Sequence, residues 1–197
     1  DEVSLAEVYD LEHDEISEDL AFYREMAERG MGGVIDLGCG SGRLFGPLLA
    51  GGAELIVGVD GSAALLDRAR ARIERDPILA AAQAAGAIEL VHADVRSVRR
   101  QDRFGLAVLA GLVPHLDGPE DAVRALSAAR RLLARDGMLV IDTIGPGGLP
   151  REDLPLSVDW EREDGVRRIV RRSQIERREA PEGLRVRYVT MTDLVGR

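Results

Sequence analysis

The sequence of 197 residues has the usual length of one domain, and its 45% hydrophobic content is enough for a sizeable core. Its 26 basic and 35 acidic side chains give a net charge of −9, which argues against nucleic acid or an anionic membrane as the main partner. Every basic residue is arginine, so neither a pyridoxal-phosphate Schiff base nor a lysine-containing phosphate loop can form. The arginine- and alanine-rich composition is typical of a GC-rich bacterial genome.

Cysteine content and hydropathy predict a cytoplasmic protein. Cys39 is the only cysteine, which excludes an internal disulfide and a four-cysteine metal site, and no metal is expected. No stretch approaches the ~20 apolar residues of a membrane-spanning helix. The acidic segment 1–19 is unlike the basic and then apolar opening of a signal peptide.

In chain order, the sequence first predicts a helical cap and then a parallel sheet. Segment 1–30 interleaves apolar and acidic residues, as one or two amphipathic helices do. Five short apolar runs in segment 31–147 indicate buried strands: Val34–Leu37, Leu55–Val59, Ile88–Val91, Leu106–Ala110 and Met138–Asp142. Helices or turns are predicted between them at Gly42–Ala50, Ala63–Arg75, Val95–Arg99 and Pro119–Leu133. This alternation predicts a doubly wound, Rossmann-like, mostly parallel α/β sheet.

After Gly145–Gly148 the pattern changes to an antiparallel one. β-forming residues alternate with charged ones over Val166–Ile175 and Leu184–Thr192, on either side of a turn at 180–183, which predicts a hairpin within segment 148–197. We expect the whole chain, 1–197, to form a single domain in which this hairpin covers an acceptor site.

A glycine-rich loop follows the first predicted strand. Gly38, Gly40 and Gly42 permit a tight turn and a close approach of a ligand to the backbone, and the N-terminus of the next helix favours an anionic group. A nucleotide-like ligand is therefore predicted. The dinucleotide fingerprint requires glycine at position 43, where this chain has arginine, and this weakens an NAD interpretation.

Acidic residues end the neighbouring predicted strands. Asp60 stands about 20 residues beyond the glycines, where a carboxylate can accept hydrogen bonds from both ribose hydroxyls. Asp94 follows the third predicted strand, and Asp36 lies near the end of the first. Because ligands bind at the carboxyl edge of such sheets, we expect these acids and the loop to converge there.

With this loop and these acids, residues 9–145 resemble the class I S-adenosylmethionine-dependent methyltransferases of the small-molecule type. The resemblance implies that Asp36 and the loop, with Cys39, hold the methionine part of the cofactor, that Asp60 and Gly61 bind the ribose, and that Asp94 and Val95 address the adenine. It also implies cofactor contacts for Leu65 and Ala110. Asp136 stands where the family usually has proline, a small departure.

The resemblance extends to the cap and to a possible base. Tyr9 and Tyr23 are similar in position to cap residues that close over the cofactor, although an aromatic side chain on an amphipathic helix often only packs. Methyl transfer needs chiefly alignment, so a catalytic base is optional. If one acts, the candidate is His115, which follows the fourth predicted strand, whereas His13 is a weaker candidate and His92 a structural residue. Cys39 is expected to pack rather than to react.

The sequence thus predicts an enzyme that transfers a methyl group from S-adenosylmethionine to a nitrogen, oxygen or carbon of a small molecule, with S-adenosylhomocysteine as product. Two alternatives remain open: an NAD-binding oxidoreductase of similar architecture, and a catalytically silent S-adenosylmethionine-binding regulator. Such family members normally continue with one more helix and two strands. An unprotected sheet edge invites pairing, so a homodimer is a further expectation.

Overall fold

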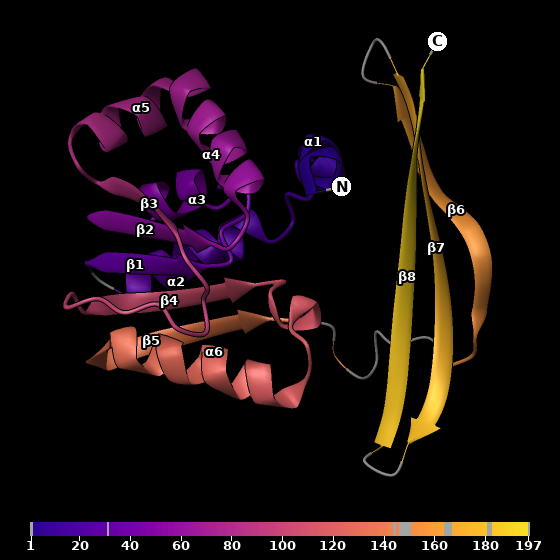
Figure 1. The fold of residues 1–197 in the computed structure, drawn as a ribbon. Helices are drawn as coiled ribbons and strands as arrows, with labels where there is room; N and C mark the ends of the chain where they lie inside the picture. The colour runs from indigo at the N-terminus through magenta and orange to yellow at the C-terminus, as the bar shows by residue number, and fades with distance from the viewer. Residues whose placement is uncertain are drawn as a thin grey trace. The chain divides into compact units, whose positions relative to one another are not determined.

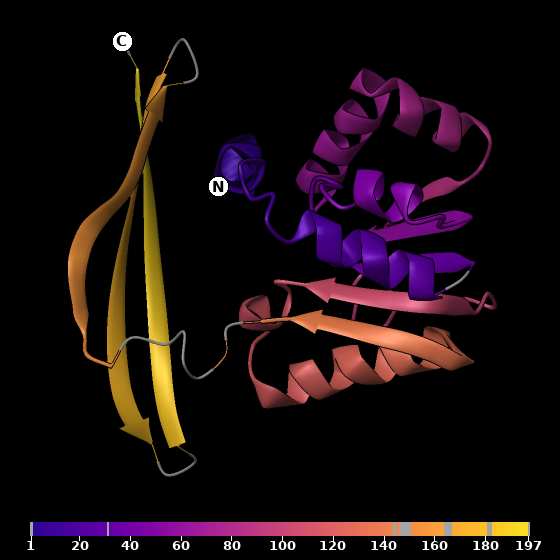
Figure 2. The same ribbon diagram turned by 180° about the vertical axis from the view of Figure 1, so that it is seen from behind.

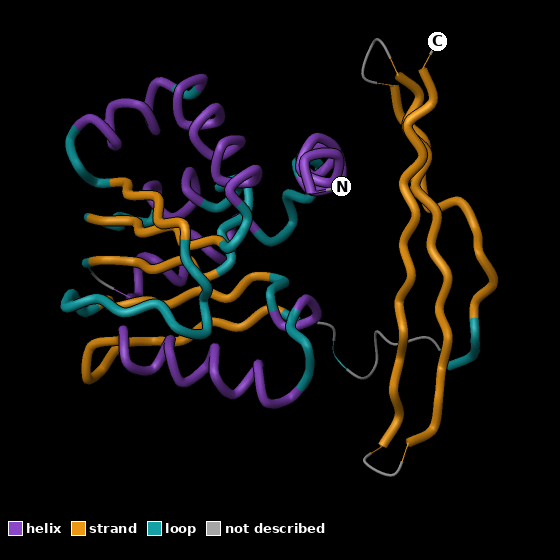
Figure 3. The backbone as a smooth tube through the Cα atoms, in the orientation of Figure 1, coloured by secondary structure: helices purple, strands orange, loops and turns teal. Residues whose placement is uncertain are grey.

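The computed structural model describes residues 2–30, 32–143, 145, 151–163, 167–180 and 183–196, which form two compact units, 1–143 and 144–197. Figures 1 and 3 show the elements of each unit. The first unit contains six α-helices among its described residues: α1 (Glu2–His13), α2 (Leu20–Gly30), α3 (Phe45–Ala50), α4 (Ala63–Arg75), α5 (Pro77–Ala84) and α6 (Pro119–Leu132). Within this described part, no helix is long and apolar enough to cross a membrane.

The first unit is built on a five-stranded parallel sheet. Its strands are β1 (Gly33–Leu37), β2 (Leu55–Asp60), β3 (Ile88–His92), β4 (Phe104–Ala110) and β5 (Leu133–Asp142), in the order β3-β2-β1-β4-β5. The predicted α/β sheet is therefore confirmed. The order reverses at β1 and β4, and ligands of such sheets bind at the carboxyl ends of the strands at this switch point.

The two faces of the sheet bury different helices because side chains alternate along each strand. Val34 of β1 packs in a cluster with residues of α2, α3, α4 and α5, whereas Ile35 packs in a second cluster with residues of α6. Figure 2 shows α6 below the sheet and α2 in front of it. Helices thus cover both faces, as a doubly wound fold requires.

Two boundaries and one additional helix are the main differences from the sequence prediction. Helix α3 begins at Phe45 rather than at Gly42, because Gly42 has a φ of +77° that a helix does not accommodate. A further helix, α5, occupies part of segment 80–87, which is rich in alanine; the Asp76 carboxylate accepts a hydrogen bond from the Ile78 amide (2.8 Å) and caps the helix. Strand β5 extends back to Leu133, with an irregularity where it pairs with β4.

The second unit is a three-stranded antiparallel sheet in the order β6-β7-β8, with strands β6 (Leu154–Glu163), β7 (Arg167–Ala180) and β8 (Gly183–Gly196). The predicted antiparallel segment is confirmed, and β7 and β8 form its hairpin. Strand β6 was not predicted. Parts of the expected boundary at 145–148 and of the turn at 180–183, together with Val166, lie outside the described residues. The single-domain assignment stays a prediction.

Candidate functional site

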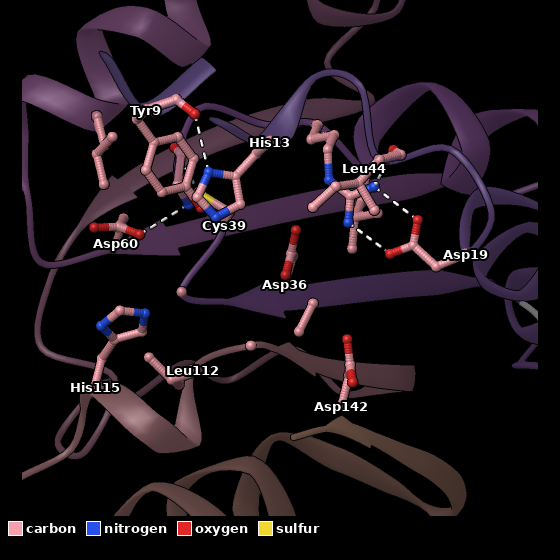
Figure 4. Close-up of a pocket in the computed structure, with 17 residues that line it drawn as sticks. Tyr9, His13, Asp19, Asp36, Cys39, Leu44, Asp60, Leu112, His115 and Asp142 are labelled. Carbon is pink, nitrogen blue, oxygen red and sulfur yellow. Dashed lines mark hydrogen bonds and ion pairs between the residues drawn. The ribbon is translucent and has the colours of Figure 1, made fainter. Parts of the chain in front are cut away.

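A cavity of about 410 Å³ opens at the carboxyl ends of β1, β4 and β5, below the glycine loop and α1 (Figure 4). Its lining residues come from the loop, the strand ends, α1 and the connection between α1 and α2. They are Tyr9, His13, Ile16, Asp19, Asp36, Gly38, Cys39, Gly40, Arg43, Leu44, Asp60, Leu65, Ala110, Gly111, Leu112, His115 and Asp142.

The glycine loop forms one wall, and its shape depends on Gly40. Gly40 has a φ of +54°, and a Cβ atom there would lie 2.8 Å from the hydroxyl oxygen of Tyr9. The amides of Gly38 and Cys39 both donate to the Val59 carbonyl, at 2.8 and 3.0 Å, and so anchor the loop on β2. A larger residue at position 40 would separate the loop from α1.

Asp36 is a buried carboxylic acid in the middle of this cavity (Figure 4). Its Oδ1 atom has no hydrogen-bond partner within the described residues. Burial, with a smaller contribution from the nearby Asp60 carboxylate, raises the pKa of Asp36 to about 7. A buried acceptor without a partner is destabilising, and a bound cation or hydrogen-bond donor would relieve this.

Asp60, at the end of β2, fixes the glycine loop by hydrogen bonds. Its Oδ2 atom accepts a hydrogen bond from the Gly40 amide and its Oδ1 atom one from the Ser62 amide, both at 2.8 Å. Each carboxylate oxygen has more than one lone pair, so Asp60 can still accept hydrogen bonds from a ligand.

The cavity carries an excess of negative charge. Four carboxylates line it, those of Asp19, Asp36, Asp60 and Asp142, whereas Arg43 is the single arginine among the described lining residues. Arg43 donates to both oxygens of Asp19, at 2.8 and 2.6 Å, and to the carbonyl of Ile16 at 2.9 Å. The Arg43 guanidinium holds the pKa of Asp19 below its usual range. Three carboxyl groups therefore face the cavity without a cationic partner among the residues that the structure describes.

Of the two predicted cap tyrosines, Tyr9 lines the first cavity and Tyr23 does not. The Tyr9 ring stacks on His13 with centroids 4.0 Å apart, and the imidazole Nδ1 of His13 lies 2.9 Å from the Tyr9 carbonyl. Burial and the carboxylates of Asp60 and Asp36 raise the pKa of Tyr9 to about 12, so its hydroxyl stays a hydrogen-bond donor. Tyr23 is buried beside the cavity instead of lining it, and its hydroxyl donates to Oδ2 of Asp142 at 3.4 Å.

A second cavity, of about 500 Å³, shares Gly38, Asp60, Leu112 and His115 with the first. It also contains Gly61, His92, Asp94 and Val95. Arg96 donates to both carboxylate oxygens of Asp94 and also pairs with Asp121, and its hydrogen bonds lower the pKa of Asp94. His92 points its Nε2 atom at the Gly61 carbonyl, 3.0 Å away.

His115 and Cys39 differ sharply in exposure. His115 ends a short 3-10 turn, Val113–His115, and its exposed side chain borders both cavities. No hydrogen bond to its ring is found in the described part of the chain. Cys39 is buried, and burial raises the pKa of its thiol, as expected of a packing residue rather than a nucleophile.

The structure brings most of the predicted residues together. Tyr9, Asp36, Gly38, Cys39, Gly40, Asp60, Leu65, Ala110 and His115 line the first cavity, and Gly61, Asp94 and Val95 line the second. Tyr23 and Gly42 line neither of them. Sequence reasoning missed Asp19, Arg43, Leu112 and Asp142 and gave His13 little weight. Of these, Asp142 could have been found, because it ends a predicted strand at the ligand-binding edge.

Comparison with known proteins places this site in a known fold. A profile of the family described as the methyltransferase domain matches residues 34–137. The solved structure of DesVI from Streptomyces venezuelae is similar with a TM-score of 0.67 at 23% identity, over 97% of this chain and 83% of that chain. The comparison with curated proteins gave no significant match.

Two further solved structures are similar. KedS8 from Streptoalloteichus sp., described as a sugar N-methyltransferase, gives a TM-score of 0.66 at 21% identity, over 96% of this chain and 78% of that chain. CalS10 from Micromonospora echinaspora, an amino pentose methyltransferase solved with S-adenosylmethionine bound, gives a TM-score of 0.67 at 20% identity, over 96% and 82%. At these identities the likeness shows the fold.

Proposed function

This chain belongs to the methyltransferase-domain family, and from that premise we propose that it transfers a methyl group from S-adenosylmethionine to a small-molecule nucleophile. The charge of the first cavity supports this proposal most directly. Asp36, Asp60 and Asp142 offer carboxyl groups to a ligand that carries a positively charged sulfonium and a positively charged amino group.

The same charge opposes the NAD alternative. A dinucleotide would bring its pyrophosphate to the glycine loop, beside Asp36 and Asp60, and the one lining arginine is already paired with Asp19. Like charges in a partly buried site repel strongly because little water screens them. The cavity therefore favours the sulfonium cofactor over the dinucleotide.

In this proposal some residues bind the cofactor, and others align the methyl acceptor. When bound, S-adenosylmethionine supplies a methyl group activated by the sulfonium. The Oδ1 atom of Asp36, which has no partner within the described residues, would accept a hydrogen bond from the amino group of the methionine part. Asp60 would accept hydrogen bonds from the ribose hydroxyls while it also binds the Gly40 amide of the loop. Asp94, held by Arg96, borders the second cavity, where the adenine would lie. Alignment of an acceptor near His115 would supply most of the acceleration.

Calorimetric titration tests the cofactor. We expect the protein to bind S-adenosylmethionine and S-adenosylhomocysteine and to show no measurable heat with NAD, for the electrostatic reason given above. Binding of NAD without binding of either S-adenosyl ligand would refute the proposal. Transfer of a labelled methyl group from S-adenosylmethionine to an acceptor would then distinguish an active enzyme from a catalytically silent regulator.

The variant Asp60→Ala, titrated in the same way as the parent, tests the role of Asp60 in cofactor binding. It removes the acceptor for the ribose hydroxyls and also the acceptor for the Gly40 amide. We expect S-adenosylhomocysteine binding to weaken by about 2–4 kcal/mol, because hydrogen bonds to charged groups contribute ~1.5–3 kcal/mol each and water recovers part of the loss. An unchanged dissociation constant would reject this role of Asp60.

Amines are the first acceptor class to screen. KedS8 is described as a sugar N-methyltransferase and CalS10 as an amino pentose methyltransferase, and a carboxylate-lined cavity suits an amine. Oxygen and carbon nucleophiles remain the alternatives. A cytoplasmic location, a bacterial origin and a homodimeric assembly stay predictions.

We further propose that segment 148–197 covers the acceptor site. Deletion of residues 151–197 is expected to abolish turnover and to leave S-adenosylhomocysteine binding measurable, because the proposed cofactor residues all precede Thr143. The far-UV circular dichroism of the truncated chain serves as the folding control. Full turnover by the truncated chain would show that the segment is peripheral.

A further inference from the structure

Helix α1 forms part of the cavity wall, and polar contacts join it to α4. It carries Tyr9 and His13, both of which line the first cavity, and the element that it packs against is α4. Asp10 lies in the last turn of α1, and Asp14 directly follows the helix, with its amide donating to the Asp10 carbonyl at 2.8 Å; Arg68 and Arg72 lie one turn apart on α4. Residues four apart on a helix share a face, so the two acids and the two arginines face each other as matched pairs.

Direct ion pairs join the two helices. Asp10 accepts from Nε of Arg68 at 2.7 Å and from Nη2 of Arg72 at 3.3 Å, and Asp14 accepts from Nη2 of Arg72. Burial alone would raise the pKa of Asp10, but hydrogen bonds from Ser41 and Arg68 and the charge of Arg72 lower it. The side chains of Asp10 and Arg72 are only 17% and 26% exposed, so water screens this pair less than a surface pair.

Arg72 also reaches the glycine loop. Its Nε atom donates to the Ser41 carbonyl at 2.9 Å, and its Nη2 atom lies 3.3 Å from the Ser41 hydroxyl. Ser41 is itself buried and stands between Gly40 and Gly42. One planar guanidinium therefore contacts α1 and the loop at once, which the fixed fork of arginine permits and a lysine ammonium does not.

From these contacts we propose that Arg72, together with Asp10, is a positioning residue that holds α1 against the glycine loop and so keeps Tyr9 and His13 in the wall of the cofactor cavity. The inference rests on the proposed function for its ligand. Arg72 is not among the residues that line the first cavity, so it acts through its contacts with α1 and with the glycine loop. Loss of the contact would release α1, open the wall and speed the dissociation of the ligand.

Arg72→Gln is the test variant, with Arg75→Gln as its matched control. Arg75 lies three residues further along α4 with an exposed side chain, so its replacement removes the same charge from the same helix. We expect Arg72→Gln to raise the dissociation constant of S-adenosylhomocysteine by about 10- to 100-fold, chiefly through faster dissociation, since bonds to charged groups are lost. Arg75→Gln is expected to bind as the parent does.

Ionic strength supplies a readout that a merely structural role would not change. Raising NaCl from about 0.05 to 0.5 M should weaken binding to the parent and to Arg75→Gln, because salt screens the Asp10–Arg72 pair. Binding to Arg72→Gln should change much less. Arg72→Lys keeps the positive charge but lacks the planar guanidinium, so its affinity for S-adenosylhomocysteine should lie between those of the parent and Arg72→Gln.

Hydrogen exchange of the free protein tests the position of α1 without any ligand. Arg72→Gln should speed amide exchange in residues 2–13 and leave β1 and β4 protected. Parental exchange in α1 together with parental affinity would overturn the proposal. Faster exchange throughout residues 32–143 would also overturn it, since Arg72 would then be a general structural residue. A parent that fails to bind S-adenosylhomocysteine would refute the proposed function, and the exchange experiment would still decide the role of Arg72.

Discussion

Asp36→Asn is expected to weaken S-adenosylhomocysteine binding by about 10- to 100-fold at pH 8, because it removes the carboxylate charge opposite the ligand's amino group. The same substitution is expected to raise the melting temperature of the free protein. Asp36 is fully buried, and its Oδ1 atom has no partner in the described residues, so an ionised Asp36 destabilises the ligand-free fold. Weaker binding with greater stability distinguishes this role from a structural one.

The pH dependence of stability follows from the direction in which burial moves the pKa of Asp36. This pKa is raised from 3.8 to about 7, so the folded protein keeps a proton that the unfolded chain has lost between these values. The contribution of Asp36 to stability therefore falls as pH rises through this window, by roughly 4 kcal/mol in all if ~1.4 kcal/mol is lost per pH unit. The gain in melting temperature for Asp36→Asn should be large at pH 8 and small at pH 4.

Ligand binding should depend on pH in the opposite sense. Below pH 7 the parent must release a proton from Asp36 to bind the cationic amino group, so its affinity should fall by about tenfold per pH unit. Calorimetry in two buffers with different ionisation enthalpies measures this proton release. Asp36→Asn is the control for protonation of other groups, and a pH dependence that persists unchanged in this variant would contradict the assignment.

His115→Ala is expected to lower kcat by roughly 10²–10⁴ if His115 acts as the general base, while cofactor affinity stays near that of the parent. The side chain follows β4, borders both cavities and is exposed, as an acceptor-facing residue should be. The measurement is kcat against pH for parent and variant, with the acceptor found by screening. The fall in kcat on the acidic side of the profile, which protonation of a general base causes, should disappear in the variant.

A smaller loss with an unchanged pH profile would instead make His115 a positioning residue. A variant with parental kcat at every pH would remove it from the catalytic list altogether. Alignment of the acceptor would then account for the whole acceleration.

Local sequence patterns were sufficient for the sheet and for α4. Buried parallel strands are short apolar runs, and each predicted run falls within an observed strand. Strand β6 was missed because Pro155 interrupts it, and its apolar residues Leu154, Leu156 and Val158 remain exposed. Strand β5 was predicted too short because a glycine at position 137 signals a turn, whereas the strand pairs with β4 at Leu133 and again from Met138, with a register shift between these two pairs.

Site residues at strand ends were predictable, but those brought in by tertiary contacts were not. Asp60 and Asp94 follow from the rule that ligands bind at the carboxyl edge. The bond from Tyr23 to Asp142 spans 119 residues, and the pairing of Arg43 with Asp19 depends on how the α1–α2 connection crosses the loop. No periodicity in the sequence encodes these contacts, and they decide which tyrosine lines the cavity.

Because Cys39 is buried, the reactivity of this single thiol reports local opening of the glycine loop. Its Sγ atom lies beneath the glycine loop, so close to Gly58 that a Cβ atom there would be only 3.0 Å away. Burial should therefore slow the reaction of a thiol reagent with Cys39, and faster labelling would report local opening of the loop. Because the sequence contains no lysine, side reaction of a thiol reagent with lysine amines does not complicate this measurement.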